Sequence, residues 1–385
     1  MRVLYDHQAF TKQRYGGISR CFMELYQHLP IDIEAEMSVA ESNNVYLKNI
    51  YGLMPDDYQY SHFICKHDFP MKRRLHIIYD KITNGGYYPD YNQTCSKKKI
   101  QEGNFDIFHP TYFEDYFLPY LNGKPFVLTI HDMIPELYPR FFDSNNWQIK
   151  MKQKLAPLAS AIIAVSENTK KDIIRYLNVP EEKVHVIYHG CSFPSASETF
   201  CSIKDYAPYI LYVGGREFYK NFVLFVKHIR SFLLSHPEIS VLCTGEAFNE
   251  SEIQLLTSYG VRDRFIHYWC TTDEELYTLY HNALCFVFPS EYEGFGIPIL
   301  EAYKADCPVL LNFASCFPEI AGDAAIYFEM DSNSSDIVDK LEHIYLMDAG
   351  EKETLLAKQH DRLKQYSWEK SAQQLKNVYK LILQT

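Results

Sequence analysis

The stretch 289–301, PSEYEGFGIPILE, gathers residue types that bind anions and hydroxyl groups. It follows the apolar run 284–288, which predicts a buried strand, and its glycines let the backbone approach a ligand closely or adopt positive φ. Pro298 suits the first turn of a helix, where exposed N–H groups and the helix dipole favour an anion such as phosphate. Two carboxylates, Glu293 and Glu301, flank this position, so the stretch suggests a ligand that carries both phosphate and hydroxyl groups.

A sugar nucleotide has both parts, because carboxylates accept strong, charge-assisted hydrogen bonds from vicinal hydroxyl groups. The spacing alone leaves a second interpretation open. In that interpretation Glu301 complements the helix dipole and Glu293 caps a turn.

The elements that must position this stretch alternate along the chain. Short apolar runs predict strands at 3–5, 126–130, 161–165, 184–188, 209–213, 241–243, 264–268, 284–288, 309–312 and 325–328. Helix-like segments lie between most of them, among them SENTKKDIIRYL with Ser166 as its N-cap, DEELYTLYHNA and DSNSSDIVDKLEHIYLM. Strands that are apolar throughout and alternate with helices predict parallel sheets covered on both faces. The fold class is α/β, and the doubly wound pattern occurs twice.

The length of 385 residues predicts two domains rather than one core. Periodicity lapses in HGCSFPSASETFCSIKDYAP, residues 189–208, where small polar residues and prolines gather. We therefore expect a linker at 191–205, between an N-terminal Rossmann-like domain at 1–190 and a C-terminal one at 206–367. The helix pattern YSWEKSAQQLKNVYKLILQT at the end has an apolar stripe that must pack on one of them.

The composition of the chain indicates its cellular compartment and excludes some classes of binding partner. No apolar run approaches the roughly 20 residues that span a bilayer, and MRVLYDHQAF shows no secretory signal, so we expect a cytoplasmic protein. The ten cysteines are scattered with no C-x-x-C pair, which favours buried thiols over disulfides or a zinc site. A net charge of −11 argues against general binding of nucleic acid or of an anionic membrane by the whole surface.

A basic island at 66–99 stands against that acidic background, with the sequences KHDFPMKRRLHIIYDK and SKKKI. One interpretation is a solvated charged region. The other is a surface that touches lipid headgroups or an anionic acceptor, which would place the protein on the cytoplasmic face of a membrane as a peripheral protein.

The segment SEYEGFGIPILEA, residues 290–302, closely resembles the E-x7-E motif of the retaining glycosyltransferases of family 4, with Glu293 and Glu301 as its two acids. Other segments agree in order along nearly the whole chain: RYGGISRCFMEL (14–25), FHPTYF (108–113), TIHDMIPELYP (129–139), AIIAVSENTKKDI (161–173), YILYVGGREFYKNF (209–222) and FPEIAGDAAIYF (317–328). The resemblance implies the GT-B architecture, two Rossmann-like domains facing a cleft. It also implies that the first domain is on the acceptor side, that the second holds the nucleotide-sugar, and that residues 368–385 cross back onto the first.

The resemblance also implies roles for residues of the second domain. Arg216 and Lys220 in YVGGREFYKNF are expected against the donor pyrophosphate, where fixed cations stabilise the leaving nucleoside diphosphate. In many relatives the arginine directly follows the first glycine, whereas Gly215 intervenes here, so Lys220 is the safer assignment. Glu293 is expected against the transferred sugar and Glu301 against the ribose. The other donor-binding residues expected here are Gly214, Gly215, Gly294, Phe295, Gly296 and Ile297.

In the first domain, the resemblance assigns Gly16 and Gly17 of YGGIS to a loop that closes over the phosphates and the acceptor side. His131 in TIHDMIPE corresponds to a histidine near the transferred sugar, with Asp132 beside it. A purely structural hydrogen-bonding role is the alternative for this histidine. His109 in FHPTYF has weaker support and could simply shape the cleft.

The reaction implied is a front-face substitution that retains the anomeric configuration, in which the departing phosphate oxygen takes the proton of the acceptor hydroxyl. We expect no cofactor and no catalytic metal. A Walker loop, zinc spacings and a Ser/His/Asp order are absent from the sequence. A sugar-nucleotide epimerase of the same fold is the main alternative to a hexosyltransferase, and a catalytically silent scaffold is a further one.

The donor and acceptor are only indicated by the combination of YGGIS, HDMIPE and GGREFYKNF. It looks like bacterial enzymes that assemble surface polysaccharides, several of which use GDP-mannose. The expectation is GDP-mannose ahead of a UDP-hexose, with a saccharide or lipid-linked saccharide acceptor in polysaccharide or O-antigen biosynthesis.

Overall fold

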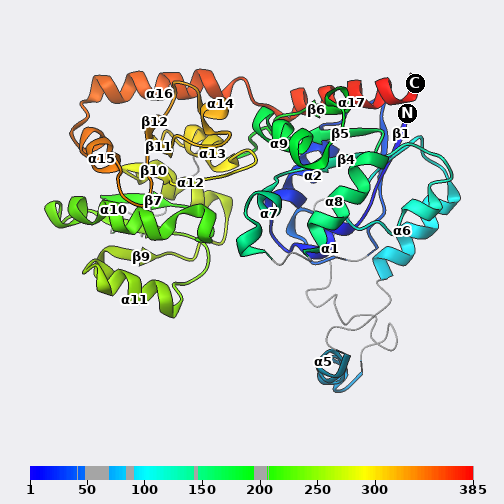
Figure 1. Ribbon diagram of the computed structural model, residues 1–385, viewed down its shortest axis with the longest axis horizontal. Coiled ribbons are helices and arrows are strands. Elements are labelled where there is room, and N and C mark those ends of the chain that lie inside the picture. The colour runs from blue at the N-terminus through cyan, green and yellow to red at the C-terminus, as the bar shows by residue number, and fades with distance from the viewer. Residues whose placement is uncertain are drawn as a thin grey trace. The chain divides into compact units, whose positions relative to one another are not determined.

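The computed structural model describes residues 1–40, 42–47, 69–83, 91–142, 146–194, 206 and 208–384. The chain forms two compact units (Figure 1). Unit 1 comprises Met1–Val165, Thr169–Ile187 and Trp368–Thr385, and unit 2 comprises Ser166–Asn168 and Tyr188–Ser367. Most of the expected linker, from residue 195 to 205, lies outside the described residues.

Unit 1 is built on parallel strands that form two short sheets. One sheet has the order β2-β1-β3 and the other the order β4-β5-β6, and a bridge between Phe108 and Phe126 connects them. The strands are β1 (Arg2–Tyr5), β2 (Glu34–Met37), β3 (Ile107–His109), β4 (Val127–Ile130), β5 (Ala161–Ala164) and β6 (Val184–Val186). Strands β3, β4 and β5 are buried along their whole length, as expected for a parallel sheet covered on both faces.

The helices of unit 1 alternate with these strands. They are α1 (Gln8–Lys12), α2 (Gly17–His28), α5 (Lys72–Thr83), α6 (Tyr91–Glu102), α7 (Ile134–Leu137), α8 (Trp147–Leu158), α9 (Glu167–Leu177) and α17 (Trp368–Gln384). Short 3-10 turns lie at η1 (Val45–Leu47), η2 (Leu118–Tyr120), η3 (Pro139–Phe141) and η4 (Glu181–Lys183).

Unit 2 contains a six-stranded parallel sheet with the order β12-β11-β10-β7-β8-β9. Its strands are β7 (Tyr209–Tyr212), β8 (Ser240–Cys243), β9 (Phe265–His267), β10 (Cys285–Phe288), β11 (Val309–Asn312) and β12 (Ile326–Phe328). Counted from the first strand of the unit, this is the order 6-5-4-1-2-3 of a Rossmann fold, with the direction of winding reversing between β7 and β10.

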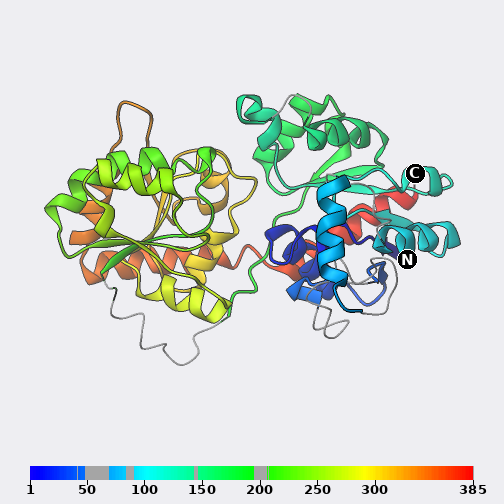
Figure 2. The ribbon, with the colours of Figure 1, turned by 90° about the horizontal axis from the view of Figure 1, so that it is seen from below.

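Helices cover both faces of this sheet (Figure 2). They are α10 (Phe222–Ser235), α11 (Glu250–Ser258), α12 (Asp273–Asn282), α13 (Ile297–Lys304), α14 (Phe317–Ala321), α15 (Ile337–Leu346) and α16 (Ala349–Leu363), with 3-10 turns η6 (Phe218–Lys220) and η7 (Arg262–Arg264). The apolar stripe of α10, from Phe222 to Leu233, is buried in the core of the unit.

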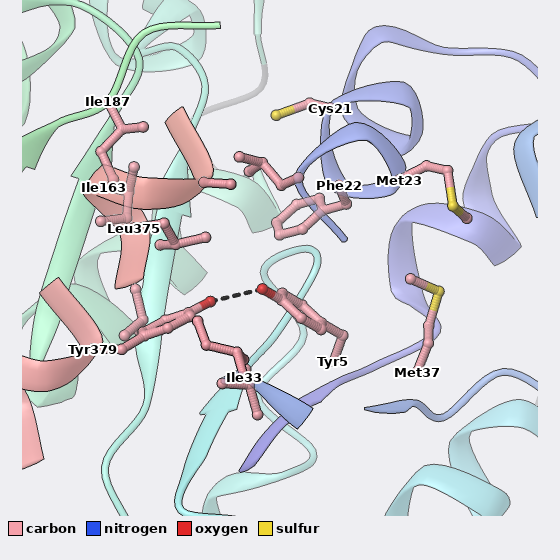
Figure 3. Close-up of a cluster of buried hydrophobic side chains, with 14 of the residues drawn as sticks. Tyr5, Cys21, Phe22, Met23, Ile33, Met37, Ile163, Ile187, Leu375 and Tyr379 are labelled. Carbon is pink, nitrogen blue, oxygen red and sulfur yellow. Dashed lines mark hydrogen bonds between the residues drawn. The ribbon is translucent and has the colours of Figure 1, made fainter. Parts of the chain in front are cut away.

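The last helix, α17, packs in the core of unit 1. Leu375 and Tyr379 of α17 lie among side chains of β1 and α2, including Tyr5 and Phe22 (Figure 3). The hydroxyl groups of Tyr5 and Tyr379 are 2.8 Å apart and share a hydrogen bond. The buried apolar side chains of α17 therefore hold the end of the chain against its first strand, β1.

The predicted fold class, with two Rossmann-like domains and a C-terminal helix that crosses back to the first, is confirmed. Every strand predicted from the sequence is present with its ends within two residues, and β2 and β3 were not predicted. The cysteines that the structure describes form no disulfide with one another. Among the described helices, none is both long and apolar enough to cross a bilayer.

Candidate functional site

The two loops singled out in the second half of the sequence follow adjacent strands of unit 2. Strands β7 and β10 pair in parallel, with Val287 opposite Tyr212, so their carboxyl ends lie side by side. Because the winding reverses between these strands, the loops that follow them diverge and leave room for a ligand at that edge. Residues 213–221 follow β7 and residues 289–296 follow β10, so both predicted donor-binding motifs lie at the switch point.

Lys220 and Glu293 bring these two loops into direct contact. Nζ of Lys220 lies 2.6 Å from Oε1 of Glu293, and the hydroxyl group of Ser290 donates to the same oxygen at 2.8 Å. Both charged side chains are mostly buried, with 18% and 13% of their surface exposed. An ammonium group has three donors, so Lys220 can bind Glu293 and still donate to an anion.

The backbone around Glu293 is held by the last residue of β11 and by a residue that follows this strand. The hydroxyl group of Ser315 donates to the carbonyl oxygen of Glu293 at 2.8 Å and accepts from its N–H at 3.2 Å. Nδ2 of Asn312 donates to the carbonyl oxygen of Ser290 at 3.2 Å. On the other side, the N–H of Glu291 donates to the carbonyl oxygen of Tyr219. The loop is therefore fixed from both neighbouring strands.

Gly296 allows helix α13 to begin directly after this loop. It is the N-cap of α13 with a φ of 90°, in the left-handed region. A Cβ atom at this position would lie 3.1 Å from Ile299 Cδ1 and 3.3 Å from Phe317 Cε1. A side chain would thus meet both backbone strain and close contacts. Pro298 lies in the first turn as predicted, and the start of α13 favours an anion.

Glu301 lies deeper than Glu293, on α13, and is buried. The hydroxyl group of Tyr280, on α12, donates to its Oε2 at 3.4 Å. Burial, followed by the negative charge of Glu301, raises the pKa of Tyr280 well above its usual value. The phenol therefore stays protonated and acts as a hydrogen-bond donor to the carboxylate.

Arg216 is held by α11 and the loop before it. Its Nε lies 2.7 Å from Oε1 of Glu252, its Nη2 donates to the carbonyl oxygen of Glu246 at 2.8 Å, and the guanidinium lies 4.9 Å from the ring centre of Phe248. Its Nη1 is buried and has no hydrogen-bond partner within the described part of the chain. The Lys220–Glu293 contact thus forms without Arg216, the residue whose spacing departs from the family pattern.

The remaining predicted residues of unit 2 shape the loops. Gly214 has a φ of 101°, and the carbonyl oxygen of Gly215 accepts from the hydroxyl group of Tyr212. Gly294 is buried, and Ile297 is half-buried at the start of α13. The ring of Phe295 is buried and lies 4.8 Å from the ring of His189, so this side chain holds the loop against that residue.

The glycine pair of unit 1 lies at the start of α2. Gly16 is its N-cap in an extended conformation, and a Cβ atom there would lie 2.2 Å from Oε1 of Gln13, which accepts from the N–H of Ser19. No heavy atom lies within 4 Å of a Cβ atom built on Gly17. A side chain at Gly16 would thus displace the amide of Gln13 from Ser19, whereas the Cβ position of Gly17 is open.

His131 follows β4 in unit 1, and its ring lies 5.9 Å from the ring of Phe22 on α2. Burial lowers the pKa of His131 to about 4, despite the opposing effect of Asp132. The imidazole is therefore neutral at physiological pH. The Asp132 carboxylate accepts from the N–H of Ile134, the first residue of the short helix α7.

His109 lies in the core of unit 1. It is fully buried, with Nδ1 2.6 Å from the hydroxyl group of Tyr379 and Nε2 2.8 Å from the hydroxyl group of Thr129. Burial, with a smaller contribution from His131, lowers the pKa of His109 to about 3. His109 therefore has a structural role, because its two hydrogen bonds connect α17 to β4.

Sequence reasoning missed several residues that support these loops. Asp6, directly after β1, is buried and accepts from the N–H and the hydroxyl group of Thr111 and from the hydroxyl group of Tyr116. Lys152 is buried on α8, where it pairs with Glu136 at 2.7 Å and donates to the carbonyl oxygen of Asp132. An acidic residue at the end of an apolar strand was a usable signal for Asp6, whereas nothing in the sequence pointed to Lys152.

Family models match both halves of the chain. The model described as "Glycosyl transferases group 1" matches residues 200–367, and the model described as "Glycosyltransferase Family 4" matches residues 57–192. The O-antigen chain mannosyltransferase B of Escherichia coli is 30% identical over 292 residues, which are 70% of this chain and 73% of that protein. The O-antigen chain mannosyltransferase RfbU of Salmonella typhimurium is 28% identical over 218 residues, 57% of this chain and 60% of that protein.

Solved structures share the fold over the full length. Alr3699/HepE from Anabaena, in complex with UDP and glucose, has a TM-score of 0.70 at 16% identity and covers 99% of this chain and 100% of its own. A glycosyltransferase from Rickettsia africae has a TM-score of 0.66 at 16% identity and covers 100% of this chain and 99% of its own. Nothing in these comparisons supports the sugar-nucleotide epimerase considered as an alternative. The chain belongs to the glycosyltransferases of group 1 and family 4, and it is a glycosyltransferase with the GT-B fold.

Proposed function

We propose that this protein is a retaining hexosyltransferase that uses a nucleotide-sugar donor, with GDP-mannose favoured over a UDP-hexose. The observation that carries the proposal is the contact between Lys220 and Glu293 at the switch point of unit 2, beside the start of α13. It places a cation, a carboxylate and a helix N-terminus at one sheet edge, and a nucleotide-sugar presents a diphosphate next to sugar hydroxyl groups. The similarity to two O-antigen mannosyltransferases supports mannose as the sugar.

Different residues of unit 2 bind different parts of the donor. The diphosphate is bound by Lys220, by the N–H groups at the start of α13 and by the loops of Gly214, Gly215, Gly294 and Gly296. Lys220 also stabilises the negative charge that develops on the diphosphate as the glycosidic bond breaks. Glu293 accepts from hydroxyl groups of the transferred sugar. Glu301 accepts from the ribose, with Tyr280 fixing the position of its carboxylate. Arg216 contributes through Nη1, while Glu252 fixes the rest of its guanidinium group.

Unit 1 contributes the acceptor side. Gly17, whose Cβ position is open, lets the backbone approach the phosphates, and neutral His131 binds a hydroxyl group of the transferred sugar. In the front-face reaction the bond from the anomeric carbon to the diphosphate oxygen breaks and the bond to the acceptor oxygen forms on the same side. The acceptor proton passes to the departing phosphate oxygen, so no cofactor or metal is needed.

We further propose that the acceptor is a saccharide or a lipid-linked saccharide in polysaccharide or O-antigen biosynthesis. The names of the two mannosyltransferases support this acceptor class. Such an acceptor also gives the basic island at 66–99 a role, because a lipid-linked saccharide is met at a membrane surface.

Calorimetry with GDP and UDP tests the donor site. We expect the protein to bind one of the two nucleotides. Lys220→Ala should weaken this binding and should lower the rate of transfer by about 10²- to 10³-fold, because the substitution removes a fixed cation from the leaving group. Lys227→Ala is the matched control, because this exposed lysine of α10 bonds only to the carbonyl oxygen of Ser332 among the contacts described. If neither nucleotide binds, or if Lys220→Ala behaves as the Lys227→Ala control does, the donor site is wrongly placed.

A further inference from the structure

A buried ion pair lies next to the loop that carries His131. The side chains of Lys152 on α8 and Glu136 on α7 are 1% and 4% exposed, and Nζ of Lys152 lies 2.7 Å from Oε2 of Glu136. The ring centre of Phe113 lies 5.7 Å from the same ammonium group. Lysine and glutamate are rarely buried this deeply, so the pair needs an explanation.

The stability of unit 1 does not supply that explanation. The attraction between two buried charges offsets the loss of their hydration only where the remaining hydrogen-bonding atoms are also satisfied. Oε1 of Glu136 is buried and has no hydrogen-bond partner among the residues that the structure describes. An apolar pair of similar volume is therefore expected to make unit 1 about as stable, or more stable.

The pair instead fixes the backbone beside His131. Nζ of Lys152 donates to the carbonyl oxygen of Asp132 at 3.1 Å and lies 3.9 Å from Sδ of Met133. Asp132 and Met133 are the whole connection between His131 and the start of α7. Since an ammonium group has three donors, one lysine joins α8 both to this connection and, through Glu136, to α7.

We propose that Lys152 and Glu136 are positioning residues, which hold the loop 131–133 so that the imidazole of His131 keeps one orientation in the site. Both side chains are too deeply buried to touch a substrate, so they act through the backbone of Asp132. The inference rests on the proposed function, in which His131 binds a hydroxyl group of the transferred sugar. A misplacement of about 1 Å can lower the rate of an enzyme about 100-fold, so a loop held in this way affects kcat.

The kinetics of a variant without the pair test this inference. Lys152→Met with Glu136→Leu replaces both charges by apolar side chains of similar volume, and its urea midpoint should be close to that of the parent or higher. The kcat of transfer should nevertheless fall by about 10- to 100-fold. The dissociation constant of the nucleoside diphosphate should not change, because the proposed site for it lies in unit 2.

Two further variants separate positioning from other effects of the substitutions. Glu136→Gln removes the charge but keeps an oxygen that accepts from Lys152, so kcat should stay within about threefold of the parent value. Lys376→Met with Asp32→Asn is the matched control. It removes a 2.6 Å ion pair of α17 from the same unit and should leave kcat unchanged.

Nuclear magnetic resonance of the His131 ring follows the loop independently of activity. In the parent, burial holds the pKa of His131 at about 4, against the opposing effect of Asp132. In the variant without the pair the loop relaxes and water reaches the ring, so this pKa should rise toward its ordinary value of 6.5. Glu136→Gln and the control should titrate as the parent does.

Three results would overturn the proposal. An unfolded variant without the pair would show that the two charges serve stability. A parental kcat or a parental titration of His131 in that variant would show that the pair does not hold the loop. An equal loss of kcat in Glu136→Gln or in the control would show that charge or stability, rather than the hydrogen bonds of Lys152, governs the rate. If the parent neither binds a nucleoside diphosphate nor transfers a sugar, the proposed function fails, and the titration of His131 still decides the role of the pair.

Discussion

At the scale of single residues, the two acids of the E-x7-E motif have different surroundings. Glu293 lies at the loop, where Lys220 and Ser290 bind the same carboxylate oxygen. Glu301 is buried on α13 and meets the phenol of Tyr280. A carboxylate next to a cation at the switch point suits the reacting part of the donor. A carboxylate held inside the unit suits a part that does not change during the reaction.

This difference predicts different kinetics for the two variants. Glu301→Gln should mainly raise the donor KM, because ribose contacts are alike in the ground and transition states. Glu293→Gln should mainly lower kcat, because in the proposed site positive charge develops at the anomeric carbon beside Glu293. In calorimetry, Glu301→Gln should bind the bare nucleoside diphosphate more weakly, and Glu293→Gln should bind it about as well as the parent. A reversed pattern would show that the two carboxylates are assigned the wrong way round.

The residue types of the site could be predicted from the sequence, but their partners could not. The motif identified Glu293 and Lys220, yet they are 73 residues apart and only the pairing of β7 with β10 shows that they touch. Arg216 shows the same limit. Its partner Glu252 lies 36 residues away on α11, and no local pattern links the two. Side-chain pairing across a sheet depends on strand order, which composition and periodicity do not contain.

At the scale of elements, the strands that the sequence predicted are the ones with continuous apolar runs. The two that were missed have other patterns. Strand β2 has the sequence EAEM and lies at the edge of its sheet, where its charged residues can face water. Strand β3 has the sequence IFH, and its two apolar residues between Asp106 and His109 are too few to form an apolar run. The apolar stripe of α17 was visible in the sequence, but only the family resemblance indicated that it packs on the first domain.

The hydrogen bonds of His109 join three elements, β3, β4 and α17, and predict a pH dependence of stability. The pKa of His109 is about 3 in the folded protein, below the ordinary 6.5, so the unfolded chain takes up this proton first. Its contribution to stability is complete above about pH 6.5 and is lost as the pH falls toward 3. The free energy of unfolding should fall by about 1.4 kcal/mol per pH unit from this histidine between about pH 6 and pH 4.

Urea unfolding of the full chain, measured at intervals between pH 7 and pH 4, checks this value. His109→Gln should be less stable at pH 7, because buried hydrogen bonds are disturbed, and its stability should fall less steeply with decreasing pH. The exposed His343→Gln in unit 2 should retain the slope of the parent. If His109→Gln and the parent have equal slopes, burial of a neutral His109 does not govern the acid response.

At the scale of the whole molecule, each unit carries a distinct share of the proposed chemistry. Unit 2 holds the cation, the two carboxylates and the helix start proposed for the donor, and unit 1 holds the glycine pair and His131. Unit 1 also holds the pair of Lys152 and Glu136 that is proposed to position this histidine.

Nuclear magnetic resonance of the product of a transfer reaction tests the central claim most directly. The protein is incubated with GDP-mannose or UDP-glucose and a saccharide acceptor, and the configuration at the transferred anomeric carbon is compared with that of the donor. We predict that one donor is consumed, that its nucleoside diphosphate is released in equal amount to the glycoside formed, and that the configuration is retained. An inverted product, or conversion of the donor to an epimer without transfer, would contradict the account.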